Sequence, residues 1–386
     1  MKDVLIKGGR LIRENEILDD MDVLLSGGKI ASVDRALHDK AEGAEIVDAG
    51  GLYISPGFLD IHIHGAMGEM CEIATLEGMK KISLTLAKYG TTAFLPTLGA
   101  SPHEDTVRLL KIIAGAKDKV EGAEIVGINM EGPYLNPKWA GAQRADAIRN
   151  YSKEELKEYI KVTDGLLTVM GLAPEVEGGM ELVSDLKEAG IIPCAVHTDA
   201  TYDQTTEAMK HGLKLTGHTF NAMRPIHHRE PGIIVAAMLT DDLFSEYIAD
   251  GFHTYTPIIE MAYRLKGEKR LVFVSDSVGG MGIPDGYYEF FGTQCKVSNG
   301  RITIGDSDIL AGSASPLLFG VKNLHKTSEI IPLPHIIRMA TLTPAEVIGV
   351  EDRLGSIDVG KDASVILLND KLDVVRVWVS GKEIRY

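Results

Sequence analysis

The sequence predicts an α/β protein: a (β/α)8 TIM-like barrel with a small β-sandwich domain formed by both chain termini. Three observations lead to this prediction. The central part of the chain alternates short apolar runs with amphipathic helical patterns, giving eight βα units, the number that closes a parallel barrel. Both ends of the chain contain strand-like runs broken by glycine pairs. Histidines and carboxylates follow several of the central apolar runs.

The two ends of the chain resemble each other in pattern. Residues 1–52 contain VLIKGGRLI and VLLSGGKIASVD, which are short strand-like runs with Gly-Gly turns. Residues 355–386 contain ASVILLND and VVRVWVSGKEI, which have the same character. We therefore expect residues 1–52 and 355–386 to build one small β domain, with the larger barrel, residues 53–354, inserted between its halves.

The central unit supplies the eight predicted barrel strands, and helical patterns such as TLEGMKKISLTLAKYG fall between most of them. The predicted strands end near His64, Thr97, Glu131, Leu172, His197, His218, Asp250 and Asp276. The C-terminal ends of parallel barrel strands meet at one rim, where active sites form. Polar residues at these ends are therefore expected to converge.

The first of these strands is unusual. In GFLDIHIHG, Asp60, His62 and His64 alternate with apolar residues, which is the period of a strand and places all three on one face. An exposed polar face would explain this pattern without any ligand. Two histidines on one face can also bind one cation, because neutral imidazole is the commonest metal ligand.

Metal-binding side chains recur at the later strand ends. Each has an ordinary explanation when taken alone: Glu131 can lie at a helix N-terminus, and His218 can be a buried core histidine. Together they would leave many desolvated polar groups without partners, unless a divalent cation binds them. Nitrogen and oxygen ligands without thiolate suit zinc, with iron, manganese or cobalt as alternatives. The expected ligands are His62, His64, Glu131, His197, His218 and Asp276.

Composition excludes some partners. The chain has 386 residues, 45% of them hydrophobic, which is enough for a large core. Its 55 acidic and 40 basic residues give a net charge of −15, which argues against nucleic acid or an anionic membrane surface as a partner. No apolar run is long enough to span a membrane. Cys71, Cys194 and Cys295 are sparse and odd in number, which suits reduced thiols in a cytoplasm.

Several motifs resemble those of the amidohydrolase superfamily and, within it, of the N-acetylglucosamine-6-phosphate deacetylase family. PGFLDIHIHG indicates the superfamily, whereas EGP followed by GHTFNAM and REPG is more specific. The other matching segments are NMEGPYLN, VHTDATYDQ, HHREPG, DGFH, SDSVGGMG and LAGS. The resemblance implies a metal-dependent hydrolase that removes acetyl from N-acetylglucosamine 6-phosphate.

The resemblance also divides the metal ligands. It implies that Glu131, His197 and His218 hold one divalent ion, with Glu131 replacing the carboxylated lysine of other superfamily members. A second site would be formed by His62, His64 and Asp276. Some family members lack the histidine pair and use one metal, so we expect one or two ions per chain. Asp276 would take a proton from water and deliver it to the leaving amine.

The resemblance implies a substrate site and an assembly. Arg229 of HHREPG would reach the phosphate from a neighbouring subunit, so a homodimer is expected, although a solvated basic loop would also explain this motif. The expected contacts to the phosphorylated amino sugar are Ala142, Gln143, Asn221, the Ala222 backbone, Arg229, His253, Leu310, Ala311 and Gly312.

Two departures from the family pattern concern the substrate. Gln143 stands where the family usually has a histidine, and ASPL follows LAGS where the family usually has a run with threonine and methionine. Other substrates therefore stay open: N-acetylgalactosamine 6-phosphate, an unphosphorylated sugar, or an N-acyl amino acid amide. A metal-free scaffold is a further alternative, but all six ligand positions are intact.

Overall fold

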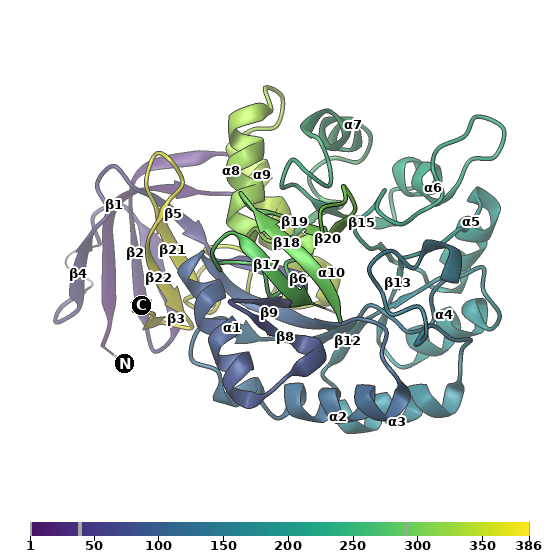
Figure 1. Ribbon diagram of the computed structural model, residues 1–386. Helices are drawn as coiled ribbons and strands as arrows, with labels where there is room; N and C mark the ends of the chain where they lie inside the picture. Colours follow the sequence, from purple (N-terminus) through teal and green to yellow (C-terminus); the bar gives the residue numbers. More distant parts are fainter. Residues whose placement is uncertain (1, 38–40, 291, 386) are drawn as a thin grey trace.

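The computed structural model describes residues 2–37, 41–290 and 292–385. A barrel with surrounding helices forms the centre, and a separate sheet lies to one side of it (Figure 1). Strands from the start of the chain (purple) and from its end (yellow) lie together in that side sheet. The chain therefore leaves the side sheet, builds the barrel, and returns.

The barrel contains the eight predicted strands. Neighbouring strands are parallel, and each is mostly or fully buried, as expected when helices cover a parallel sheet. The amide of Asp276 donates to the carbonyl of His62 at 2.9 Å, which joins the last strand to the first. The strands are β6 (Phe58–Ile63), β9 (Thr91–Leu98), β11 (Ile128–Met130), β12 (Leu167–Leu172), β13 (Ile192–Ala195), β14 (Leu215–Thr216), β15 (Phe244–Ile248) and β16 (Leu271–Val274). A short strand, β10 (Glu124–Ile125), also pairs with β9.

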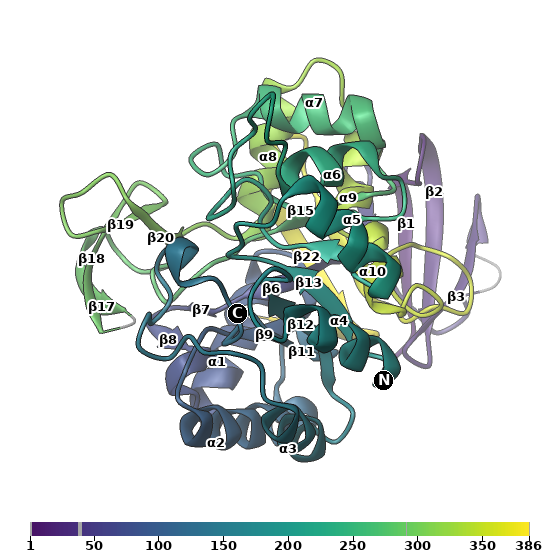
Figure 2. The ribbon, with the colours of Figure 1, turned by 90° about the vertical axis from the view of Figure 1, so that its right-hand side faces the viewer.

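Helices follow the barrel strands in the expected alternation and surround the barrel (Figure 2). A capping box fixes the start of the helix at Tyr202: the Thr201 side chain accepts from the Gln204 amide, and the Gln204 side chain accepts from the Thr201 amide. The helices are α1 (Leu76–Lys88), α2 (His103–Ala114), α3 (Lys153–Thr163), α4 (Gly179–Glu188), α5 (Tyr202–His211), α6 (Ile233–Leu239), α7 (Thr256–Lys266), α8 (Leu317–Thr327), α9 (Leu333–Met339) and α10 (Leu342–Ile348). The predicted (β/α)8 barrel is confirmed.

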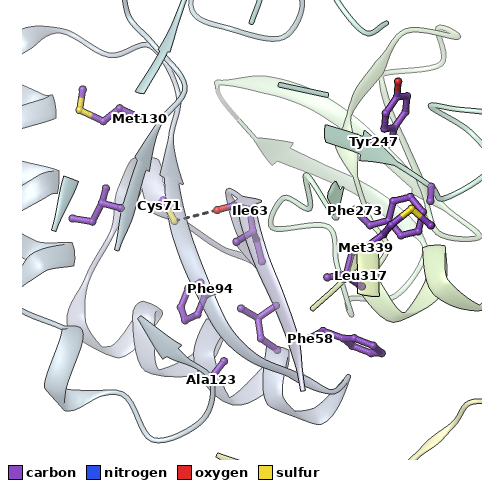
Figure 3. Packing of buried hydrophobic residues seen from close by; sticks show 14 of the residues in the cluster. Phe58, Ile63, Cys71, Phe94, Ala123, Met130, Tyr247, Phe273, Leu317 and Met339 are labelled. Carbon is purple, nitrogen blue, oxygen red and sulfur yellow. Dashed lines mark hydrogen bonds between the residues drawn. The ribbon is translucent and has the colours of Figure 1, made fainter. Parts of the chain in front are cut away.

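The main core lies between the strands and the helices. Figure 3 shows Phe58 of β6 and Phe273 of β16 near Leu317 of α8 and Met339 of α9. All four side chains are at most 3% exposed. Burying a large apolar side chain stabilises a fold by about 1.5–3 kcal/mol, so this layer holds the strand ends in fixed positions.

The two chain ends form one eight-stranded sheet with a core of its own, which includes Trp378. At the β3 edge, the Ile30 amide donates to the carbonyl of Lys361, which precedes β21, at 2.9 Å. The strands are β1 (Val4–Ile12), β2 (Ile17–Ser26), β3 (Lys29–Asp34), β4 (Glu45–Asp48), β5 (Tyr53–Pro56), β21 (Val365–Leu368), β22 (Val374–Val379) and β23 (Lys382–Glu383). The domain limits stay a prediction, and β5 pairs within this sheet although it lies beyond residue 52.

A four-stranded antiparallel sheet follows β16 and was not anticipated from the sequence. It projects from the rim of the barrel (Figure 2). Its strands are β17 (Gly286–Phe290), β18 (Thr293–Ser298), β19 (Arg301–Ile304) and β20 (Leu310–Ser313). The LAGS motif is β20, and the Ser313 amide donates to the Asp276 carbonyl at 2.8 Å, so this sheet places LAGS beside the rim. Among the described helices, none is both long and apolar enough to cross a membrane.

Candidate active site

Glu131 lies at the centre of four imidazoles. Its Oε1 is 2.9 Å from Nε2 of His197, 2.8 Å from Nε2 of His218 and 3.6 Å from Nε2 of His62. Its Oε2 is 3.1 Å from Nε2 of His64. These residues come from four different strand ends, so the predicted convergence at the rim is found.

Asp276 completes the cluster from β16. Its Oδ1 is 3.5 Å from Nε2 of His64 and 3.8 Å from Nε2 of His62. His62, His64 and Asp276 present potential ligand atoms that all lie within 4.8 Å of one another. His62, Glu131 and His218 do the same, whereas His197 joins the cluster through its contact with Glu131.

The cluster is buried and requires positive charge. His64 and Glu131 are each 3% exposed. Burial lowers the pKa of His64, but the carboxylates of Glu72 and Glu131 outweigh it and raise that pKa to about 10. Burial raises the pKa of Glu131, but nearby His197 and His218 hold it well below its usual range. Nε2 of His62 faces this centre without a hydrogen-bond partner among the described residues. The donor set therefore fits a divalent cation.

Outer acceptors orient two of the imidazoles. Nδ1 of His64 contacts Glu72 Oε1 at 2.8 Å, and Nδ1 of His197 contacts the Trp139 carbonyl at 2.7 Å. An acceptor at Nδ1 leaves Nε2 as the ligand atom and raises its basicity. Glu72 was not among the predicted residues, and its position just after a cysteine carries no recognisable signal.

Glu246 is the second carboxylate that sequence reasoning missed. It lies on β15, is fully buried, and its Oε2 is 2.9 Å from Nδ1 of His62. The same oxygen accepts the backbone amide of His218 at 3.1 Å. An acidic residue within the buried run FSEYI is the signal that could have found it.

Three of the predicted ligands have left-handed backbone angles. The φ values are +46° for His197, +26° for His218 and +47° for Asp276. Such angles cost of order 1–3 kcal/mol for residues with a Cβ and cluster at functional sites. The turns that follow the strands therefore position these side chains through backbone angles that lower local stability.

A cavity of about 300 Å³ opens above the cluster. Seven of the nine predicted substrate residues line it: Ala142, Gln143, Asn221, Ala222, His253, Leu310 and Gly312. Ala311 does not, because residues alternate along β20 and its side chain packs on Val278 and its neighbours instead. Arg229 does not line it either; its guanidinium lies on an exposed loop, 2.9 Å from His228 Nε2. The lining residues that were not predicted include Lys138, Trp139 and Ile309.

Gln143 connects the cavity to the metal ligands. Its Nε2 donates to Oε2 of Glu131 at 2.5 Å, and its Oε1 accepts the Ala100 amide at 2.7 Å. Both ends of the amide are therefore engaged by the protein. The side chain predicted to contact substrate also orients Glu131.

His253, which lines the cavity, is held by Asp250. Oδ2 of Asp250 contacts Nδ1 of His253 at 2.8 Å, and its Oδ1 accepts the amides of Phe252 and His253 at 2.8 Å each. Burial lowers the pKa of His253, but the hydrogen bond and charge of Asp250 outweigh it and raise that pKa. His253 is thus set to donate from Nε2 to an oxygen-rich ligand.

The chain is similar to known proteins over most of its length. The sequence profile described as the amidohydrolase family matches residues 53–384. The N-acetylglucosamine-6-phosphate deacetylase of Vibrio furnissii is 35% identical over 358 residues, 92% of this chain and 88% of that one. The N-acetylgalactosamine-6-phosphate deacetylase of Escherichia coli O157:H7 is 30% identical and covers 98% of both chains. A mutant N-acetyl-D-glucosamine-6-phosphate deacetylase of Mycobacterium smegmatis, solved with N-acetyl-D-glucosamine-6-phosphate, matches with a TM-score of 0.93, 26% identity and 100% coverage of both chains.

Proposed function

Because this chain belongs to the amidohydrolase family, we propose that it hydrolyses the acetamide of N-acetylglucosamine 6-phosphate to glucosamine 6-phosphate and acetate. One observation supports this most: the four histidines and two carboxylates meet beneath a cavity whose other walls carry hydrogen-bonding groups. The names of the relatives supply the substrate class.

The residues fit a divalent metal centre. Glu131, His197 and His218 would hold one ion, and His62, His64 and Asp276 a second. When bound, a divalent ion polarises the amide carbonyl and lowers the pKa of water from 15.7 to about 7. Zinc suits nitrogen and oxygen donors best, with iron, manganese or cobalt as alternatives.

Asp276 is the proposed proton carrier. It is 9% exposed and borders the cavity, so its carboxylate can reach both the attacking water and the amide nitrogen. Asp276 accepts a proton as water adds to the carbonyl carbon. It then gives that proton to the nitrogen as the C–N bond breaks, because an amine leaves poorly unless it is protonated. The products are acetate and the free amino sugar.

The sugar and phosphate would be bound at the other end of the cavity. Asn221, the Ala222 backbone and His253 line it and offer hydrogen-bond donors. Lys138 stands at its edge with a 64% exposed side chain, 3.0 Å from Asp199, and can approach an anion. Arg229 lies outside this cavity, so we propose that it completes a neighbouring subunit's site in a homodimer. A phosphorylated sugar and three free, buried cysteines suit an enzyme of the cytoplasm.

N-acetylgalactosamine 6-phosphate is the second candidate substrate. The Escherichia coli relative is named for it, and Gln143 departs from the histidine usual at that position. Since both ends of the Gln143 amide are engaged by protein atoms, its contribution to the choice between the two sugars would be indirect.

The test is a deacetylation assay on purified protein. Free amine released from both 6-phosphates and from the unphosphorylated sugars is measured, with metal content determined on the same sample. The proposal expects activity on N-acetylglucosamine 6-phosphate that disappears after metal removal and returns with zinc. Faster turnover of the galactosamine 6-phosphate would favour the second candidate.

A further inference from the structure

Glu246 is a fully buried carboxylate in the barrel that touches two proposed metal ligands with one oxygen. Its Oε2 accepts from Nδ1 of His62 at 2.9 Å and from the amide of His218 at 3.1 Å. Its Oε1 has no hydrogen-bond partner among the described residues. A buried carboxylate with an unsatisfied oxygen costs stability, so its presence calls for a reason in the site.

The two residues held by Glu246 belong to different proposed ions. His218 comes from β14 and would share one ion with Glu131 and His197. His62 comes from β6 and would share the other with His64. A single carboxylate oxygen therefore fixes one ligand of each ion.

Glu246 also stabilises the strained turn that carries His218. The φ of His218 is +26°, and its amide needs an acceptor inside the barrel, which Oε2 of Glu246 provides. The carbonyl of Glu246 accepts the next amide, that of Thr219, at 2.8 Å. Successive peptide groups of the turn are thus attached to one residue of β15.

Glu72 supplies an internal comparison. Its Oε1 accepts from Nδ1 of His64 at 2.8 Å and from the Gly99 amide at 3.1 Å. It therefore holds a ligand of one proposed ion, the same ion to which His62 belongs. Within the described part of the chain, Glu72 makes no hydrogen bond or ion pair with His197 or His218.

We propose that Glu246 is a positioning residue shared by both metal ions, whereas Glu72 positions a ligand of one ion only. The inference rests on the proposed metal-dependent function. Outer acceptors at a ligand imidazole typically change metal affinity by about 10- to 100-fold when removed. Loss of Glu246 therefore weakens two ions, and loss of Glu72 weakens one.

The experiment measures zinc affinity without catalysis. The holoenzyme and the variants Glu246→Ala, Glu246→Gln and Glu72→Ala are stripped with a chelator and titrated with Zn²⁺ against a chromogenic competitor. Glu246→Ala is expected to weaken the ion of His62 by about 10- to 100-fold, because the His62 imidazole loses its acceptor. It should also weaken the ion of His218, because the turn that carries this ligand loses the acceptor of its backbone amide. Glu72→Ala should weaken only the ion of His64 by about 10- to 100-fold. Glu246→Gln retains an oxygen acceptor without the charge, so both affinities should fall between those of the parent and Glu246→Ala. The absorption spectrum of bound Co²⁺ should differ from that of the parent more in Glu246→Ala than in Glu246→Gln.

Asp22→Asn is the matched control. Asp22 is also a buried carboxylate, 3% exposed, and accepts two amides at 2.8 Å each, but it lies in the side sheet. Its variant should lower the unfolding temperature without changing either zinc affinity.

Several results would overturn the inference. One is a folded Glu246→Ala protein with both zinc affinities unchanged; another is a loss confined to one ion. If Glu246→Ala does not fold, the zinc affinities of Glu246→Gln provide the test. Affinities equal to those of the parent in this variant would contradict the inference. A parent that binds only one zinc would also overturn the sharing by two ions. A parent that binds no zinc would instead overturn the proposed function itself, so the two failures are distinguishable.

Discussion

Nε2 of His218 lies 2.8 Å from Oε1 of Glu131, although 87 residues separate them in the sequence. The barrel makes this contact, because both residues follow parallel strands whose carboxyl ends share one rim. The contact joins a carboxylate to an imidazole in a site with almost no solvent exposure.

The first prediction concerns metal content. The double variant His62→Gln, His64→Asn removes two ligands of one proposed ion and leaves Glu131, His197 and His218 in place. The parent should bind up to two divalent ions and the variant one fewer, by elemental analysis of the dialysed proteins. Equal metal content in parent and variant would contradict the assignment of the histidine pair.

The second prediction concerns the proton carrier. Asp276→Asn preserves the shape of the side chain but cannot accept a proton from water. Turnover should fall by about 10²- to 10⁴-fold, the usual contribution of a general acid–base group. The ion held through Glu131 should remain bound, which metal analysis on the same sample checks. Near-parent turnover would limit Asp276 to metal binding.

The third prediction concerns the Asp250–His253 pair. Asp250 raises the pKa of His253, so protonated His253 persists to higher pH than a free imidazole. In Asp250→Asn the pKa of His253 should fall towards its ordinary value. The KM for phosphorylated substrate should then be higher than in the parent, with a smaller change in kcat. The rise of KM with increasing pH should also begin at a lower pH than in the parent. A KM–pH profile identical to the parent's would show that His253 does not bind substrate as a cation.

The fourth prediction concerns phosphate binding across a dimer. Arg229 lies on an exposed loop and contacts its neighbour His228, so it is available to a second subunit. Arg229→Ala should raise KM for phosphorylated substrate by about 10- to 150-fold, the equivalent of a charge-assisted hydrogen bond of ~1.5–3 kcal/mol. The unphosphorylated sugar should be affected less.

Mixing Arg229→Ala chains with Asp276→Asn chains tests the shared site directly. In a mixed dimer one site lacks both residues and the other has both, so part of the activity should return. Mixed dimers that form without recovering activity would place Arg229 outside the partner's site.

The barrel and the ligand cluster could be predicted because their signals are local. Most strand ends carry a histidine or a carboxylate after a buried run, as with His64 in GFLDIHIHG. The carboxyl ends of the strands in a parallel barrel all lie at one rim. The antiparallel sheet β17–β20 was missed because its strands are short and partly exposed, although β18 alternates buried and less buried residues. Sequence order also could not show that Ala311 faces away from the cavity while Leu310 and Gly312 face it.

The outer carboxylates were missed for a different reason. Glu72 and Glu246 act through contacts with His64 and His62 that only the folded barrel creates. Nothing in the local pattern around Glu72 distinguishes it from a surface acid. Glu246 is recognisable only as a charged residue inside a buried strand. This signal marks an unusual residue but does not predict its contact with His62.

The most direct measurement is the release of amine from N-acetylglucosamine 6-phosphate by the purified protein, with metal content determined before and after chelation. The proposed function predicts turnover that is lost with the metal and restored by zinc, and that exceeds turnover of the unphosphorylated sugar. A protein that contains one or two bound ions per chain and still releases no amine from any N-acetylhexosamine 6-phosphate would contradict it.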